Sequence, residues 1–356
     1  MKILAPVNKV KEIERIINEG ADELYCGVLP GEWRARYTNV ASPNRREWTS
    51  ANLPDFGELE KAVNVARARD IPVYFTANAF YTQQQYPLIL KQIEQAKRLG
   101  VDAFIIADIG LLLNLKEKNL DVEIHISNTG TTFNSETVKF YKELGASRII
   151  LPRQLMVEEI ADLVKGENEV EFEVFILNSG CKNIDGFCTF HHGVNEVFHP
   201  FLWKFFKKLD FDRHLLELLR RLPGRLPNRI KGNFSGIDSA CLLNYKISSI
   251  PNDLDDGEIP HLRRAISAGF TLLSGADPCG ACELYRLKKI GINSVKIVGR
   301  NYSTFKKVRD VKFLRRVLQY LEQNPDISED EFRAKVKAEY KNIYRLSCNN
   351  LCYRHS

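Results

Sequence analysis

Long apolar runs are missing from this sequence of 356 residues. No stretch is long enough to cross a bilayer as a helix, which excludes a membrane span of that kind. Residues 1–7 lack the charged, apolar and cleavage regions of a secretory signal peptide and lead directly into a strand-like run. We therefore expect a cytoplasmic protein.

Several catalytic and cofactor motifs are also missing. No Gly-x-Gly-x-x-Gly follows the first predicted strand, which disfavours a doubly wound dinucleotide-binding sheet. The sequence contains no His-Glu-x-x-His segment, no Ser-His-Asp order and no obvious nucleophilic Cys–His pair. A peptidase mechanism therefore finds little support in these residues.

The composition is that of a globular protein, with 44% hydrophobic and 27% charged residues. The formal net charge is +6, and much of the excess lies in the stretch 203–231. Such a basic stretch could attract RNA or a small anionic substrate. A solvated helix face is the alternative interpretation.

Strand-like apolar runs alternate with amphipathic segments over most of the chain. Eight strands with helices between them predict an α/β fold of the (β/α)8 TIM-barrel type. Three of the predicted helices end at a glycine, which is the usual stop (Gly20, Gly100, Gly145). The predicted strands are 2–7, 23–28, 73–78, 103–108, 123–127, 148–152, 171–177 and 294–298, and the predicted helices include 10–19, 58–69, 86–99, 135–144 and 157–165.

The alternation breaks at residues 189–262, which are rich in aromatic and basic residues. We expect this segment to be an insertion that forms a lid over the barrel mouth. The barrel domain would then comprise 1–188 and 263–305, and 306–356 would form C-terminal helices and a tail.

In a (β/α)8 barrel the active site lies at the carboxyl ends of the strands. Arg153 and Arg300 follow two of these strands and could clamp a dicarboxylate by bidentate pairing, with structural ion pairs as the alternative. Asp108, Asn128 and His191 are further candidate catalytic residues. The other polar or thiol residues at predicted strand ends are Cys26, Asn78 and Asn178.

Four cysteines arrive from separate predicted loops: Cys181, Cys188, Cys241 and Cys279. In an intracellular chain such a set suggests a metal centre rather than disulfides. Spacing alone does not separate a 4Fe-4S cluster from tetrahedral zinc, and buried unmodified thiols are the third possibility.

Segment 173–188 contains a Glu-x-Phe strand, two cysteines and a glycine two residues before the second cysteine. In these features it resembles the signature of the peptidase U-32 (collagenase-like) family. Leu-Ala-Pro at 4–6, Leu-Pro-Arg-Gln-Leu at 151–155 and Val-Lys-Ile-Val-Gly-Arg at 295–300 are similar to other family segments, in the same order. The chain departs from the signature at Asp185, where the family has serine, and in the long segment 189–262.

The resemblance implies a barrel-like fold and a 4Fe-4S cluster on Cys181, Cys188, Cys241 and Cys279, with Cys282 as a substitute for the last. It also implies oxygen-independent hydroxylation of tRNA or rRNA pyrimidines or of the ubiquinone ring, with prephenate as the oxygen source. Some family members work with a partner protein of the same family. The alternatives are a metal-dependent peptidase and an RNA-binding module with a structural cluster.

Three further groups complete the candidates. Cys348 and Cys352, with His355, could bind a second metal, but a terminal pair supplies too few ligands, and surface thiols are the alternative. His191 and His192 are ordinary loop histidines, or else a metal ligand or an acid/base near the cluster. Cys26 is either a small buried apolar residue or a residue close to the substrate.

Overall fold

The computed structural model describes residues 1–37, 42–46, 49–178, 180–181, 184–187, 244–245, 270–271, 277–348 and 352–353. The chain divides into two units, Met1–Cys188 with Asp277–Ser356, and Thr189–Ala276. In the second unit the described residues are the short antiparallel pair β8 (Asn244–Tyr245) and β9 (Phe270–Thr271). Apart from 244–245, the predicted lid and its basic stretch lie outside the described residues.

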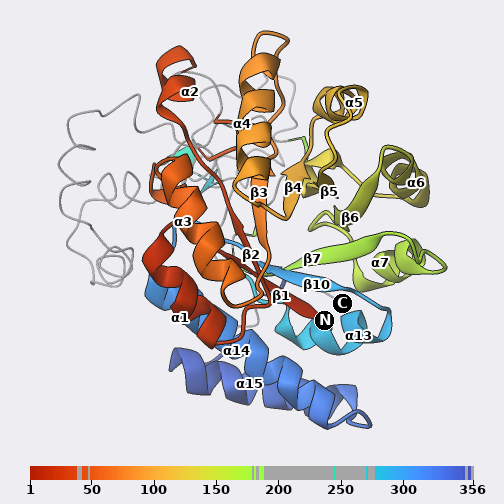
Figure 1. The fold of residues 1–356 in the computed structure, drawn as a ribbon. Coiled ribbons are helices and arrows are strands. Elements are labelled where there is room, and N and C mark those ends of the chain that lie inside the picture. Colours follow the sequence, from red (N-terminus) through yellow and green to blue (C-terminus); the bar gives the residue numbers. More distant parts are fainter. Residues whose placement is uncertain are drawn as a thin grey trace, which may run out of the picture. The chain divides into compact units, whose positions relative to one another are not determined.

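The first unit is a closed barrel of eight parallel strands with helices on its outer side (Figure 1). Each strand pairs with its sequence neighbours, and β10 closes the ring between β7 and β1. This arrangement confirms the predicted (β/α)8 barrel. The strands are β1 (Lys2–Pro6), β2 (Glu23–Cys26), β3 (Val73–Ala77), β4 (Ala103–Ile106), β5 (Glu123–Ile126), β6 (Ala146–Ile150), β7 (Glu171–Leu177) and β10 (Ser294–Ile297).

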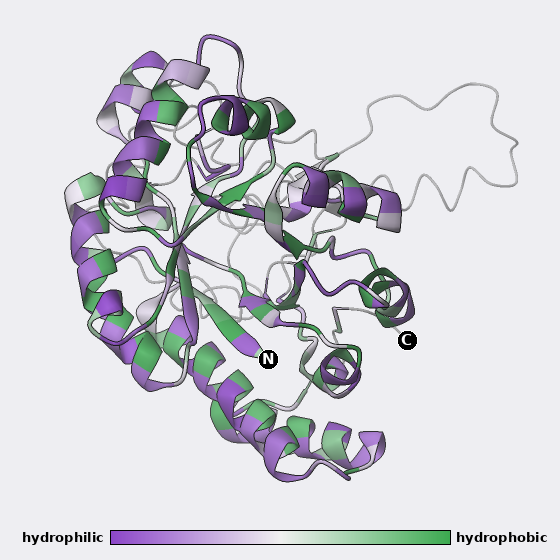
Figure 2. Cartoon of the chain, turned by 45° about the vertical axis from the view of Figure 1, so that its right-hand side comes forward, coloured by the Kyte–Doolittle hydropathy of each residue, from purple (hydrophilic) through white to green (hydrophobic). Residues whose placement is uncertain are grey.

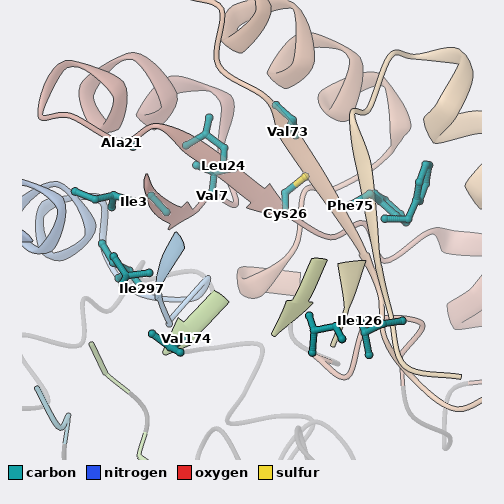
Figure 3. Close-up of a cluster of buried hydrophobic side chains, with 14 of the residues drawn as sticks. Ile3, Val7, Ala21, Leu24, Cys26, Val73, Phe75, Ile126, Val174 and Ile297 are labelled. Carbon is teal, nitrogen blue, oxygen red and sulfur yellow. The ribbon is translucent and has the colours of Figure 1, made fainter. Parts of the chain in front are cut away.

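The strands are nearly continuous apolar runs because both of their faces are covered. In β4, Ala103 and Ile105 belong to the cluster that fills the barrel interior, whereas Phe104 and Ile106 pack in the layer between strands and helices. Figure 3 shows part of the outer layer, including Cys26, whose thiol lies among apolar side chains.

The helices cover the barrel with their apolar faces and present polar residues to the outside (Figure 2). Side-chain caps start several of them, as Asp55 does for α3 and Asn134 for α6. The helices of the first unit are α1 (Ile13–Asn18), α2 (Gly31–Arg36), α3 (Phe56–Arg67), α4 (Tyr86–Arg98), α5 (Ile109–Glu117), α6 (Ser135–Glu143), α7 (Val157–Val164), α13 (Leu284–Lys289), α14 (Thr304–Gln323) and α15 (Glu329–Tyr344).

The predicted helices are present, with small shifts at their ends. The three glycines predicted to end helices all have positive φ, between 84° and 104°, which glycine adopts readily. The predicted C-terminal helices are α14, which packs against β1 and α1, and α15, which packs against α14. Among the described residues, no helix has the length and hydropathy needed to span a membrane.

Candidate active site at the barrel mouth

Arg300 follows β10 and turns across the carboxyl end of the barrel. Its Nη1 donates to Thr76 Oγ1 at 2.8 Å, and its Nη2 donates to the carbonyl of Asn44 at 3.0 Å. Gly27, directly after β2, makes room for this guanidinium, because a Cβ at that position would overlap Arg300. In these hydrogen bonds Arg300 donates to neutral oxygens.

Arg153 follows β6 and forms the ion pair that was one of its two predicted roles. Its Nη1 lies 2.6 Å from Asp185 Oδ1, and its backbone N–H donates to Asp185 Oδ2 at 2.9 Å. The guanidinium lies 3.9 Å above the centre of the Phe175 ring, an interior side chain, so it points over the barrel. Within the described part of the chain, its buried Nε has no hydrogen-bond partner.

Both arginines lie within electrostatic range of Tyr25, which stands in the barrel interior. Burial raises the pKa of Tyr25, and the positive charges of Arg300, Arg46 and Arg153 oppose that rise. Three positive charges therefore act on the upper part of the barrel interior, where the Tyr25 and Phe175 rings lie. Such a surface favours an anionic ligand with an apolar or ring-shaped body.

The segments that carry Cys181 and Cys279 run side by side at the end of β7. The Asn178 N–H donates to the Pro278 carbonyl at 3.0 Å, and Leu177 forms a β-bridge with Cys279. Gly180 lies against the Pro278 ring, since a Cβ there would come 2.8 Å from Pro278 Cγ. Two of the four predicted cluster ligands therefore belong to adjacent segments. The other two, Cys188 and Cys241, lie outside the described residues, as do His191, His192 and His355.

Tyr353 reaches the same end of the barrel from the C-terminal segment, and no motif in the sequence predicts this placement. Its ring packs against the interior cluster, and its hydroxyl donates to the Asn178 carbonyl. Its side chain also interacts with Arg153. Burial lowers the pKa of Arg153, but Asp185, Tyr353 and Cys181 raise it more strongly, so the net shift is upward. Tyr353, Arg153 and Cys181 therefore share one corner of the mouth.

Asp108 and Asn128 lie at strand ends but are held by local contacts. Asp108 caps α5 by accepting from the Leu111 N–H at 2.7 Å and also accepts from Tyr86 OH at 2.8 Å. Asn128 begins a short 3-10 helix and accepts from Ser127 Oγ at 3.3 Å. These contacts explain the placement of both side chains, and their catalytic roles remain predictions.

Asn178 and Asn78 differ in their surroundings. Asn178 donates to Asp310 Oδ2 at 2.8 Å and accepts from Lys306 Nζ at 2.7 Å, so it joins the end of β7 to α14. Asn78 donates to Ser127 Oγ at 3.2 Å, and its buried Oδ1 is without a partner among the described residues. Cys26 lies in the outer layer, away from the interior, and burial raises the pKa of its thiol to about 12.

A network of charges fills the barrel below the mouth, and sequence reasoning missed it. Lys296 Nζ lies 2.9 Å from Glu173 Oε1, and both side chains are almost fully buried. Arg148 pairs with Glu173 and, through two hydrogen bonds, with Glu23. The only signal was that charged residues alternate with apolar ones inside predicted buried strands.

The fold and the mouth define a TIM-barrel protein with a basic, thiol-bearing rim. The model of peptidase family U32 matches residues 8–197 and 229–355. The chain therefore belongs to peptidase family U32, in agreement with the resemblance found in its sequence.

Curated relatives carry names of two kinds. The chain is 23% identical over 328 residues to "tRNA hydroxylation protein P" of Escherichia coli, covering 89% of this chain and 67% of that protein. It is 26% identical over 195 residues to the protein of the same name in Haemophilus influenzae, covering 55% and 39%. It is also 25% identical over 198 residues to a "Collagenase" of Porphyromonas gingivalis, covering 52% and 44%. The chain thus spans from about two fifths to two thirds of the length of these relatives.

A solved structure of a U32 peptidase, Mk0906, aligns with a TM-score of 0.37 at 18% identity, covering 49% of this chain and 69% of that one. A score of this size adds nothing to the fold, which rests on the strand pairing itself.

Proposed function

We propose that this chain takes part in oxygen-independent hydroxylation of a pyrimidine in tRNA, with a prephenate-like diacid as the oxygen donor. Relatives named for tRNA hydroxylation support this proposal, one of them over 89% of the chain. The observation that carries it is the corner where Arg153, Cys181 and Tyr353 meet beside the segment of Cys279.

The implied iron–sulfur cluster fits the described part of its ligand set. Cys181 and Cys279 lie on segments joined by the Asn178–Pro278 hydrogen bond, and Gly180 allows their close approach. Together with Cys188 and Cys241 they would supply four soft thiolates. When bound, such a cluster supplies one-electron redox chemistry next to the barrel mouth.

The residues of the mouth would bind and orient the anionic donor. Arg153 offers a buried Nε that has no partner among the described residues, and a carboxylate would satisfy it. Arg300 adds positive charge from the end of β10, which is separated from β6 by β7, and Thr76 and Asn44 fix its guanidinium. The apolar interior cluster with Tyr25 and Phe175 would exclude water from the ring of the donor.

The test is complementation. A bacterial strain that lacks its own tRNA hydroxylation protein would receive this chain, and hydroxylated pyrimidines would be measured by mass spectrometry of digested tRNA. We expect the modified nucleoside to return with the wild-type chain and to be lost with Cys181→Ser. The purified wild-type protein, prepared without oxygen, should contain iron and acid-labile sulfide.

Two results would contradict the proposal. The cluster would have no part in the reaction if the wild-type protein contained no iron. The same conclusion would follow if the Cys181→Ser variant kept both the iron content and the activity of the wild type. A protein that instead contains zinc and cleaves collagen-derived peptides would favour the hydrolase that the family name describes. Such a result would leave the arginines of the mouth as a binding site for a peptide carboxylate.

A further inference from the structure

Four cysteines near the end of the chain form two closely spaced pairs. Cys279 and Cys282 are separated by two residues, and Cys348 and Cys352 by three. Pairs separated by two to four residues are typical of tetrahedral thiolate metal sites. The proposed cluster uses only Cys279 from this set, so the other three thiols have no assigned role.

The fold brings the two pairs together although about seventy residues of sequence lie between them. Cys279 and Cys352 face each other in a parallel β-bridge, and the Tyr353 N–H donates to the Cys279 carbonyl at 3.3 Å. Backbones paired in this way lie about 4.8 Å apart. Tyr353 also lies against Gly280, where an added Cβ would come 3.4 Å from the Tyr353 Cβ. The two segments are therefore in direct contact.

Cys282 and Cys348 belong to the same cluster of thiols. Cys282 lies in the short 3-10 helix η5 (Ala281–Glu283), against which α15 packs, and Cys348 follows the end of α15. Cys279 interacts electrostatically with Cys282, Cys348 and Cys352, and Cys282 interacts with Cys348 and Cys352. The four side chains are thus neighbours in space.

The surroundings suit a negatively charged metal–thiolate centre. Burial, together with the nearby Cys348 and Cys352, raises the pKa of Cys282 to about 11, although Arg333 and Lys337 of α15 oppose the rise. The same two cations act on Cys352. A divalent metal with four thiolates carries a net charge of about −2, which these two cations would balance.

We propose that Cys279, Cys282, Cys348 and Cys352 bind one thiophilic metal centre, either a zinc ion or an iron–sulfur cluster. Four thiolates select such metals over magnesium or calcium. As placed, no three Cys, His, Asp or Glu side chains of the described residues are arranged to hold an ion. Binding therefore requires the thiols to turn toward a common point, and coordination to the metal would deprotonate them.

This centre would fasten the C-terminal segment to the barrel. Cys352 precedes Tyr353, whose ring packs on the interior cluster and whose side chain interacts with Arg153. Metal binding at Cys352 would therefore fix Tyr353 in the mouth. Cys279 stands in both ligand sets, so Cys348 and Cys352, which the proposed function does not use, are the diagnostic residues.

The experiment compares metal contents of the full chain purified without oxygen. Zinc, iron and acid-labile sulfide would be measured in the wild type, the double variant Cys348→Ser/Cys352→Ser and Cys181→Ser. Ser347→Ala is the matched control, because this exposed residue lies in the same segment and carries no thiol. We expect the double variant to lose about one zinc, or about four irons and four sulfides, per chain, and the control to lose nothing.

Each outcome separates this inference from the proposed function. Zinc lost from the double variant with iron retained would establish a zinc site apart from the cluster, and Cys279 would then belong to only one of the two ligand sets. Iron lost from the double variant but retained in Cys181→Ser would support the inference and overturn the ligand set of the proposed function. Unchanged metal content in the double variant would overturn the inference.

A second measurement does not depend on whether a variant folds. Wild-type protein would be treated with a thiol-alkylating reagent before and after incubation with a metal chelator, and labelled cysteines would be identified by mass spectrometry. We expect Cys282, Cys348 and Cys352 to be protected from alkylation until the chelator removes the metal. Labelling that is equal before and after, or a Cys279–Cys352 disulfide in freshly purified protein, would overturn it.

Discussion

Replacing Glu23 with glutamine tests whether the charges inside the barrel stabilise it. The Glu23 carboxylate is fully buried and accepts hydrogen bonds from Arg148 Nη1 and Nη2 at 2.9 and 2.8 Å. It also accepts from Tyr74 OH at 2.9 Å and from Ser294 Oγ at 2.8 Å. Glutamine keeps the shape but removes the charge, and its amide nitrogen donates where the carboxylate accepts.

The expected loss follows from the pKa of Glu23. Burial raises this pKa, but the hydrogen bonds from Arg148, Ser294 and Tyr74 and the positive charge of Arg148 together outweigh burial and lower it from 4.5 to about 2. At 1.36 kcal/mol per pH unit, the ionised carboxylate contributes about 3 kcal/mol to the free energy of unfolding. This agrees with the roughly 3–5 kcal/mol lost when one partner of a buried ion pair is removed.

The sign of the pH dependence also follows. Because the folded-state pKa is the lower one, the contribution is complete above about pH 4.5 and is lost as the pH falls toward 2. The difference in stability between wild type and Glu23→Gln should therefore shrink below pH 4.5. At pH 7 it should be about 3 kcal/mol.

The assay is urea unfolding of the full chain, followed by fluorescence at pH 7 and at pH 3. Glu171→Gln is the matched control, because Glu171 also pairs with Arg148 but its side chain is 39% exposed. Because solvent reaches the Glu171 carboxylate and screens this pair, its loss should cost about 1 kcal/mol or less. If Glu23→Gln costs no more than Glu171→Gln, or costs the same at both pH values, the reasoning about the interior network is wrong.

Three further predictions concern the mouth. Gly27→Ala should displace Arg300, because the added Cβ would overlap the guanidinium. Prephenate binding, measured by titration calorimetry, should then weaken about tenfold. Unchanged affinity would exclude Arg300 from the site. Arg153→Gln should weaken prephenate binding by a similar factor and lessen its salt dependence, and equal salt dependence would contradict this. Gly186→Ala should cost about 1 kcal/mol more in urea unfolding than Gly145→Ala, because both residues have positive φ but only the Gly186 Cβ would overlap a neighbour. Equal costs would show that this contact does not stabilise the loop.

The strands could be predicted from the sequence because their signal is local. A strand buried on both faces is an apolar run, and glycine closes several of the helices between such runs, as at Gly100 and Gly145. The charged residues inside the strands could not be interpreted in the same way. Glu23 and Arg148 are 125 residues apart, and only closure of the barrel shows that they meet.

The loop after β7 contains a motif that could be recognised in the sequence, although only the structure explains its residues. The glycine of the family signature, Gly186, has a φ of 93° and lies against Thr129 and Thr131 of the loop after β5. Asp185, which departs from the signature, pairs with Arg153. A departure that weakened the resemblance thus provides the charge that holds an arginine at the mouth.

The cysteines carry the same argument further. Taken alone, Cys348 and Cys352 are too few to hold a metal, and their position near the end of the chain suggested surface thiols. The β-bridge between Cys352 and Cys279 changes that assessment, because it adds the Cys279–Cys282 pair to the same cluster. Ligand number is a property of the folded chain, so a count of neighbours along the sequence underestimates it wherever two distant segments pair.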